Sequence, residues 1–314
     1  MNKFAIILGE PNSINIEILA KSIARRKNCL IIGNIDLIKA QLKILKKNIK
    51  IINYNHLNKL NKTKNELLVY DVPLSFKNPF NVSAKNSKVY INKSFIVANK
   101  LSIEKKIKGF INCPIDKKVF FGHKAIGITE YLAKKNNCLG SEAMLIYNPK
   151  LSVAPITTHI SINNIKRNIK KSSVRRKIIT INTFYKKYFG KKPRIGVLGL
   201  NPHNNELRKH SEEVKVIIPT INKLKSKINV KGPFPADTIF LKENRKKFDV
   251  IVGMYHDQVL APFKTIFGFD AINITLGLPY IRISPDHGIA ADKKKLNLSK
   301  PDSLNKCISF FSKL

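Results

Sequence analysis

Three histidines each lie directly after an apolar stretch long enough to form a buried strand. The segments are PITTH at 155–159, GLNPH at 199–203 and GMYHDQ at 253–258, and they carry His159, His203 and His256. Three imidazoles that meet could hold a divalent metal and leave open positions for water or substrate. The alternative is that each histidine is a separate hydrogen-bonded loop residue. The spacing alone favours that alternative, because it matches no compact metal motif.

Two aspartates accompany these histidines. Asp237 lies in GPFPADT at 232–238, and Asp257 directly follows His256. Either carboxylate could hydrogen-bond a metal-ligating histidine or accept a proton from a substrate. For Asp237 an alternative is that its side chain caps the N-terminus of the next helix.

Two cationic residues and an amide lie beside later apolar stretches. Lys264 ends PFK at 262–264, Asn273 lies in INITLG at 272–277, and Arg282 lies in YIRIS at 280–284. Lys and Arg in such places could bind a phosphate or a carboxylate, Arg with two parallel hydrogen bonds. In a chain with so many lysines, the residue alone favours reading Lys264 as one more solvated lysine. An unpaired Arg282 between two isoleucines would be costly, which favours a bound partner.

The elements that must position these residues alternate along the chain between strand-length apolar runs and segments of helical period. Strands are predicted at 4–9, 29–33, 49–52, 67–73, 108–114, 143–146, 151–157, 195–200, 250–254 and 271–275, and helices at 14–26, 37–45, 89–101, 162–184, 212–224 and 302–311. This alternation predicts an α/β fold with a largely parallel or mixed sheet. Ligands of such sheets gather beyond the carboxyl ends of strands, where the polar groups above lie.

The charge of the chain is strongly positive but diffuse. Its 314 residues include 58 Lys+Arg and 20 Asp+Glu, a formal net charge of +38, with no Trp. The cations are spread along the chain together with abundant Asn and Ile, as an AT-rich coding sequence favours, and no basic stretch carries interleaved aromatics. We therefore expect weak, salt-sensitive adhesion to polyanions but no specific nucleic-acid partner. Without a bilayer-length apolar run or a signal peptide, a cytoplasmic protein with four reduced cysteines and no membrane contact is expected.

Taken in order, six motifs resemble those of the 4-hydroxythreonine-4-phosphate dehydrogenases, enzymes of pyridoxal phosphate biosynthesis. They are PITTH, GLNPH, GPFPADT, MYHDQ at 254–258, NITLGLP at 273–279 and DHG at 286–288. The resemblance begins at GEP, residues 9–11, and covers nearly the whole chain. It implies a homodimer with a two-domain isocitrate/isopropylmalate dehydrogenase-like fold and a central cleft. The first domain would comprise 1–128 plus 288–314, and the second, 129–287, would carry the metal and dimer contacts.

The resemblance also implies a reaction. It would be the NAD-dependent oxidation of 4-phosphooxy-L-threonine to a 3-keto acid, which loses CO₂ to give 3-amino-2-oxopropyl phosphate. A divalent metal (zinc, cobalt or magnesium) would be shared across the dimer interface. The implied site residues are metal ligands His159, His203 and His256; catalytic Asp237 and Asp257; substrate-binding Thr129, Lys264, Asn273 and Arg282; and NAD-binding His287 and Gly288.

The sequence departs from the family pattern at several places. The family's Gly-His-Thr-Glu reads GITE at 127–130, so Ile128 replaces a hydrogen-bonding histidine. Glycines of the family are replaced by Ser13 and Asn15 in the opening turn, by Asn205, Leu207 and Arg208 after GLNPH, and within HGIAADKKKL at 287–296. These changes motivate two alternatives: a dehydrogenase of the same fold for another phosphorylated or carboxylated hydroxy substrate, or a non-catalytic polyanion-binding relic.

Overall fold

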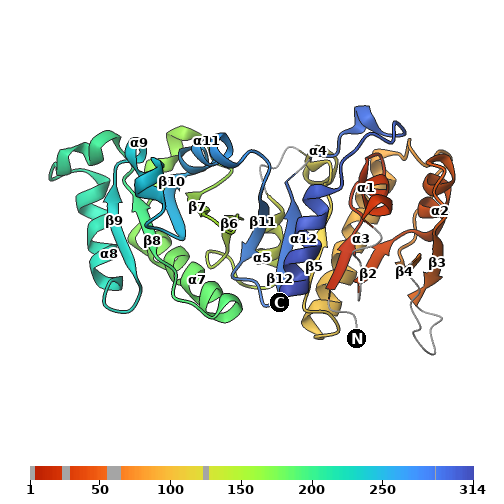
Figure 1. Cartoon of the computed structure of the whole chain (residues 1–314), viewed down its shortest axis with the longest axis horizontal. Coiled ribbons are helices and arrows are strands. Elements are labelled where there is room, and N and C mark those ends of the chain that lie inside the picture. The colour runs from red at the N-terminus through yellow and green to blue at the C-terminus, as the bar shows by residue number, and fades with distance from the viewer. Residues whose placement is uncertain (1–3, 23–28, 55–64, 123–126, 287) are drawn as a thin grey trace. The chain divides into compact units, whose positions relative to one another are not determined.

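The computed structural model of the chain describes residues 4–22, 29–54, 65–122, 127–286 and 288–314 (Figure 1). It divides into two compact units. The first combines Met1–Lys124 with Tyr280–Leu314, and the second is Ala125–Pro279. No helix in the described ranges is long and apolar enough to cross a membrane.

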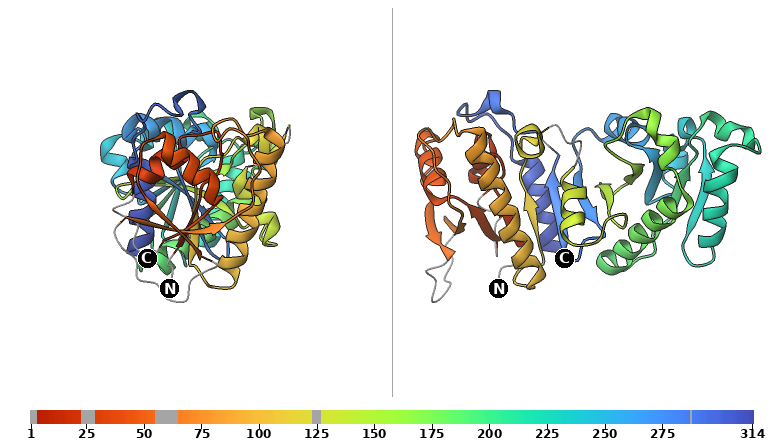
Figure 2. Two further views of the ribbon diagram at one scale, coloured as in Figure 1. Left: turned by 90° about the vertical axis from the view of Figure 1, so that its right-hand side faces the viewer. Right: turned by 180° about the vertical axis from the view of Figure 1, so that it is seen from behind.

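The first unit contains a parallel sheet with the strand order β3-β4-β2-β1-β5-β12. Its strands are β1 (Phe4–Ile7), β2 (Cys29–Gly33), β3 (Lys50–Asn53), β4 (Glu66–Asp71), β5 (Gly109–Asn112) and β12 (Ile281–Pro285). Its helices are α1 (Asn15–Lys21), α2 (Ile35–Ile44), α3 (Ala84–Ile103), α4 (Lys117–Phe121) and α12 (Asp302–Lys313). Helix α12 lies in front of the strands in Figure 1, and α3 lies in front of them in the view from behind in Figure 2. Helices on both faces explain why the central strands are apolar throughout rather than alternating.

The second unit contains a mixed sheet with the order β11-β6-β7-β10-β8-β9. Its strands are β6 (Ala143–Tyr147), β7 (Ser152–Thr157), β8 (Ile195–Leu198), β9 (Val230–Phe234), β10 (Val250–Tyr255) and β11 (Ile272–Leu276). Its helices are α5 (Ile128–Lys135), α6 (Ile165–Asn168), α7 (Lys171–Phe189), α8 (Ile218–Leu224), α9 (Ala236–Ile239), α10 (Lys242–Arg245) and α11 (His256–Phe267). Strands β7, β10, β8 and β9 are parallel, whereas β6 is antiparallel to both β7 and β11. The carboxyl ends of β7, β10 and β8 therefore meet at one edge of the sheet, and the three histidine segments begin there.

The predicted α/β fold with alternating strands and helices is confirmed, with local differences. The helix predicted at 162–184 is interrupted: a 3₁₀ turn at Ile162–Asn164 and the short α6 precede α7, which begins at Lys171. The segment predicted as one helix at 212–224 begins with a π-helical turn, Glu213–Ile217. Strands β9 and β12 were not predicted, since Gly and Pro interrupt the first and the charged Arg282 the second.

The division between the units differs from the predicted boundaries. The chain crosses between units at 124/125 rather than 128/129, and at 279/280 rather than 287/288. The second difference has a clear cause: β12 pairs in parallel with β5, with Arg282 beside Phe110. Arg282 was expected in the second domain, and this pairing places it in the first.

Candidate metal and substrate site

Two of the three predicted metal ligands lie near each other at the ends of neighbouring strands. His159 follows β7, and His256 begins α11 directly after β10. These strands pair in parallel, with Tyr255 beside Thr157. The two imidazole rings are consequently 6.2 Å apart between centroids.

Each of these imidazoles has a carboxylate beside its Nδ1. Glu130 Oε1 lies 3.7 Å from His159 Nδ1, and Asp257 Oδ1 lies 2.6 Å from His256 Nδ1. A carboxylate at Nδ1 favours the tautomer with its proton there and leaves Nε2 as a lone-pair donor. Two such nitrogens make a donor set that suits a divalent transition metal.

Glu130 is held in its ionised form. Burial raises the pKa of this carboxyl, but the nearby His159 imidazole and the hydrogen bond from Thr158 outweigh burial and bring the pKa to about 2. The Thr158 hydroxyl donates to Glu130 Oε1 at 2.9 Å. Gly127 makes room for this arrangement, since a Cβ there would overlap Glu130 Oε2 and lie 2.9 Å from His159 Cε1.

A lysine of α7, Lys177, interacts electrostatically with the same carboxylate. Burial lowers the pKa of Lys177, while the charges of Glu142 and Glu130 act in the opposite direction. The Oε2 atoms of both glutamates are buried without a hydrogen-bond partner in the described structure. The ammonium of Lys177 therefore offsets part of the carboxylate charge behind His159.

The loop that carries His203 follows β8 and turns in an unusual conformation. Five consecutive residues from His203 to Leu207 have φ between 45° and 57°. This left-handed conformation is costly for residues with a side chain, and it coincides with the place where the family's glycines are replaced. Part of the loop thus keeps a backbone conformation that glycine would adopt at less cost.

Two side chains fix the start of this loop. Glu213 is fully buried and accepts hydrogen bonds from the backbone nitrogens of Leu200 (2.7 Å) and Asn201 (2.9 Å). Gln258 accepts from Met254 N at 2.6 Å and donates to Gly199 O at 2.8 Å. Because Gln258 lies two residues after His256, it ties the His256 segment to the strand that leads to His203.

The described residues contain no group of three or more His, Cys, Asp and Glu side chains placed to hold a metal. The structure thus brings His159 and His256 together but assembles no three-ligand site within the described part of one chain. The assignment of His203 as a ligand, and of a site shared between two subunits, stays a prediction.

Two predicted substrate residues gather around a third that the sequence analysis missed. Thr129, at the start of α5, has its hydroxyl 3.1 Å from that of Thr275 on β11. Asn273 lies two residues before Thr275 and hence on the same face of that strand. Its Oδ1 is buried, with no hydrogen-bond partner among the described residues. The Asn273 Oδ1 atom can therefore accept a hydrogen bond from a ligand, on the strand face that also carries the hydroxyl pair of Thr129 and Thr275.

The remaining predicted residues of the second unit are more exposed. Asp237 is exposed in α9, whose N-cap is Pro235, and it makes no capping hydrogen bond. The alternative that Asp237 caps this helix is therefore wrong. Asp257 is also exposed. Lys264 extends from α11 with Nζ 4.7 Å from the ring centroid of Phe269.

The predicted residues of the first unit are Arg282, His287 and Gly288. Arg282 is buried, and its Nε donates to Asn112 Oδ1. His287 lies outside the described residues. Gly288 is exposed, and no atom lies within 4 Å of the position that a Cβ would take.

Sequence reasoning overlooked Glu130, Glu213, Gln258 and Thr275. Glu130 could have been found, because carboxylates are scarce in this chain and this one ends the GITE motif beside Thr129. Thr275 could not, since its contact with Thr129 joins segments that only the fold brings together.

Known proteins resemble this chain over nearly its whole length. Residues 25–311 match the family model described as "Pyridoxal phosphate biosynthetic protein PdxA". A 4-hydroxythreonine-4-phosphate dehydrogenase from Sulfurihydrogenibium sp. is 36% identical, over 96% of this chain and 95% of that protein. A putative D-threonate 4-phosphate dehydrogenase from Oceanobacillus iheyensis is 33% identical, over 91% of this chain and 90% of that protein. The crystal structure of 4-hydroxythreonine-4-phosphate dehydrogenase from Klebsiella pneumoniae superposes with a TM-score of 0.86 at 28% identity, covering 99% of both chains. These likenesses confirm the predicted fold class and the resemblance drawn from the motifs.

Proposed function

Because the chain belongs to the PdxA family of pyridoxal phosphate biosynthetic proteins, it is an oxidoreductase of that biosynthesis, and we propose that it oxidises 4-hydroxythreonine-4-phosphate with NAD and a divalent metal. The substrate hydroxyl would lose its proton to a base, and its carbon would lose a hydride to NAD⁺. The resulting 3-keto acid would lose CO₂ and take up a proton to give 3-amino-2-oxopropyl phosphate.

The observation that carries this proposal is the pair of imidazoles, His159 and His256, each backed by a carboxylate at Nδ1. Together with His203 they would hold the metal, and imidazole donors suit zinc or cobalt better than magnesium. A divalent ion there would supply Lewis acidity, lowering the pKa of the substrate hydroxyl and polarising the carbonyl that forms.

The protein's own side chains would bind and orient the substrate around that ion. Asn273 Oδ1 can accept a hydrogen bond from the substrate's amino or hydroxyl group, next to the hydroxyls of Thr129 and Thr275. Lys264 and Arg282 are proposed to bind the phosphate and carboxylate, which would hold the reacting carbon in place. Asp237 has an exposed carboxylate that can accept a proton, and Asp257 would hold the proton on His256 Nδ1.

NAD dependence is proposed from family membership. In the described segment 288–297, Gly288 is exposed, and Ala290, Lys295 and Asn297 adopt the left-handed conformation despite their side chains. We therefore assign no step of the reaction to a residue of this segment.

A homodimer with the metal site at its interface is part of the proposal, as is a cytoplasmic location. Ile160 and Ile162, which follow His159, are exposed apolar side chains. Their burial by a second subunit would offset the cost of exposing them to water and would bring another chain to the histidines.

D-threonate 4-phosphate is a second candidate substrate. The relative from Oceanobacillus iheyensis is named for that activity, and Ile128, buried at the start of α5, replaces the histidine of the family motif. An isoleucine cannot hydrogen-bond a polar group of the substrate, so this protein can differ from other family members in its preferred substrate.

The test is NADH formation by the purified protein with either substrate and zinc, cobalt or magnesium, with the His203→Ala variant as control. Metal-dependent turnover of 4-hydroxythreonine-4-phosphate that His203→Ala abolishes would support the proposal. A higher kcat/KM for D-threonate 4-phosphate would favour the second candidate, and turnover without added or bound metal would contradict the metal role.

A further inference from the structure

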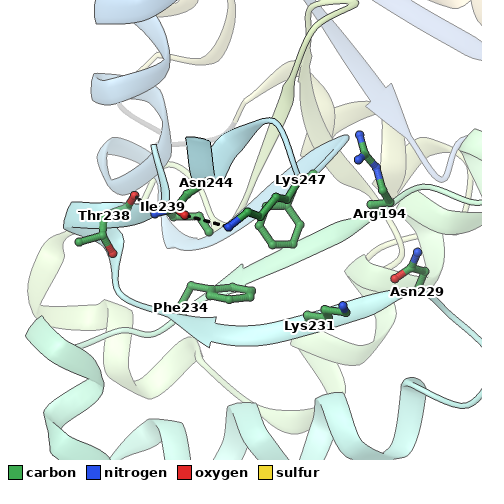
Figure 3. A pocket seen from close by; sticks show the side chains of 9 residues that line it. Arg194, Asn229, Lys231, Phe234, Thr238, Ile239, Asn244 and Lys247 are labelled. Atoms are coloured by element: carbon green, nitrogen blue, oxygen red, sulfur yellow. Dashed lines mark hydrogen bonds between the residues drawn. The ribbon is translucent and has the colours of Figure 1, made fainter. Parts of the chain in front are cut away.

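A pocket with a volume of about 360 Å³ lies along β9, the edge strand of the second unit (Figure 3). The residues proposed above for metal, substrate and cofactor do not line it. Its lining residues are Arg194, Asn229, Lys231, Phe234, Thr238, Ile239, Asn244, Lys247 and Phe248. Figure 3 shows Lys231 and Phe234 on β9 and Asn229 directly before it, with Asn244 and Lys247 on the segment across from them.

The floor of this pocket is aromatic and firmly packed. The rings of Phe234 and Phe248 meet edge to face with centroids 5.1 Å apart. Phe248 lies so close to Gly196 on β8 that a Cβ there would come within 3.0 Å of the ring. Ile239 is buried in the same hydrophobic cluster. An apolar, aromatic surface of this kind favours a planar ring that packs against it.

The rim of the pocket is cationic. Arg194, Lys231 and Lys247 contribute three positive charges, and the nine lining residues include no Asp or Glu. Asp249 pairs with Arg194 at 3.2 Å. In the described structure no carboxylate pairs with Lys231 or Lys247, so the rim keeps a net positive charge.

Positive charge alone does not indicate a specific ligand in a chain with a net charge of +38. The combination of a charged rim, amides and a hydroxyl with an aromatic floor is what defines a ligand class. Amide and hydroxyl groups can hydrogen-bond phosphate oxygens or ring nitrogens, and lysines act as point charges toward a phosphate. The volume lies at the lower end of the range for small-molecule sites, of roughly 300–1,000 Å³.

We propose that this pocket binds a small planar aromatic compound that carries a phosphate group. Either a phosphorylated pyridine or a nucleoside monophosphate has this chemistry. The ring would pack against Phe234 and Phe248, and the phosphate would be held by Lys231 and Lys247.

A ligand in this pocket would contact the helix that carries Asp237. Thr238 and Ile239 belong to α9, as Asp237 does. Asn244 donates to Thr238 O at 3.0 Å, so the segment across the pocket is already tied to that helix. Occupancy would therefore stabilise α9.

Binding is tested by calorimetric titration of the full chain at physiological salt with four probes: pyridoxine 5′-phosphate, AMP, unphosphorylated pyridoxine and inorganic phosphate. We expect one of the two ring phosphates to bind at least tenfold more tightly than inorganic phosphate or pyridoxine. The probe that binds identifies the source of the ligand. Equal affinity for the ring phosphates and inorganic phosphate would overturn the proposal, because charge alone would then account for binding.

Variants locate the site. The double variant Lys231→Gln/Lys247→Gln should weaken ring-phosphate binding at least tenfold. The matched control Lys223→Gln/Lys225→Gln removes the same charge from the exposed end of α8 and should bind as the wild type does. Equal loss in both variants, or unchanged affinity in the first, would contradict the assignment. The readout is binding rather than turnover, so its failure is distinguishable from failure of the proposed dehydrogenase activity.

Discussion

The imidazole rings of His159 and His256 lie 6.2 Å apart, and each has its Nδ1 turned to a carboxylate. The pairing follows from the sheet, because β7 and β10 are parallel neighbours that end together. Glu130 reaches His159 from another element, α5, whereas Asp257 is the next residue after His256. The orientation of each ring is therefore set by its own carboxylate, and both rings keep Nε2 available as a metal ligand.

The carboxylate of Glu130 should matter for metal affinity. In Glu130→Gln, the negative charge beside His159 Nδ1 is lost, so the imidazole is a weaker ligand and is less firmly oriented. We expect zinc or cobalt affinity to fall by about 10- to 100-fold, measured by metal titration of the metal-free protein. Glu243→Gln, which changes an exposed carboxylate of α10, serves as control. An affinity in Glu130→Gln equal to that of the control would rule out this role.

The same carboxyl should make stability depend on pH. The pKa of Glu130 is lowered to about 2 from an ordinary 4.5, so its ionised form stabilises the fold above pH 4.5, and this contribution is lost as the pH falls toward 2. The free energy of unfolding of the metal-free wild type should therefore decrease relative to Glu130→Gln over that interval. Urea unfolding at a series of acidic pH values measures the difference, and a difference independent of pH would refute the prediction.

The left-handed loop after β8 should be relieved by glycine. Leu207 has a φ of 55° and is 53% exposed, so Leu207→Gly removes backbone strain at little cost in packing. The strain is worth roughly 1–2 kcal/mol and the extra unfolded-state entropy of glycine roughly 0.5–1 kcal/mol. We expect a net stabilisation of up to about 1 kcal/mol by chemical denaturation.

Leu139→Gly is the matched control for that experiment. Leu139 is 59% exposed and is not among the residues with positive φ, so glycine there should only add unfolded-state entropy and destabilise. The two variants are expected to shift stability in opposite directions. Shifts of the same sign would show that the conformation of Leu207 is not the cause.

The hydroxyl pair of Thr129 and Thr275 should affect substrate binding. Thr275→Val keeps the side-chain shape but removes a hydrogen bond worth about 0.5–1.5 kcal/mol, so the KM for the phosphorylated substrate should rise two- to tenfold. Thr265→Val, on the exposed side of α11, should leave KM unchanged. Steady-state kinetics of both variants make the comparison, and an unchanged KM in Thr275→Val would remove Thr275 from the site.

Much of the fold was predictable because buried strands of a parallel sheet are continuous apolar runs. The strands that carry His159 and His256 could be located in this way, and so could the ends where both residues lie. The partner of β12 could not, since nothing local in YIRIS indicates that it pairs with β5. Helix α11 was missed for a different reason: Pro262 lies within it, and proline argues against a helix interior.

The site was predictable in its residue types more than in its contacts. Histidines at strand ends suggested a metal, and the motif series suggested the family. The carboxylate behind His159 and the contact between Thr129 and Thr275 depend on how α5 packs against the sheet. Such long-range packing leaves no periodic signal in one sequence.

The most direct test of the account measures bound metal and NADH formation together in the wild type, His159→Ala and His256→Ala. The wild type should bind zinc or cobalt and oxidise 4-hydroxythreonine-4-phosphate. Each variant should lose at least a hundredfold in metal affinity and lose turnover in parallel, while remaining folded by circular dichroism. A variant that binds metal and turns over substrate as the wild type does would contradict the claim that these two imidazoles hold the catalytic metal.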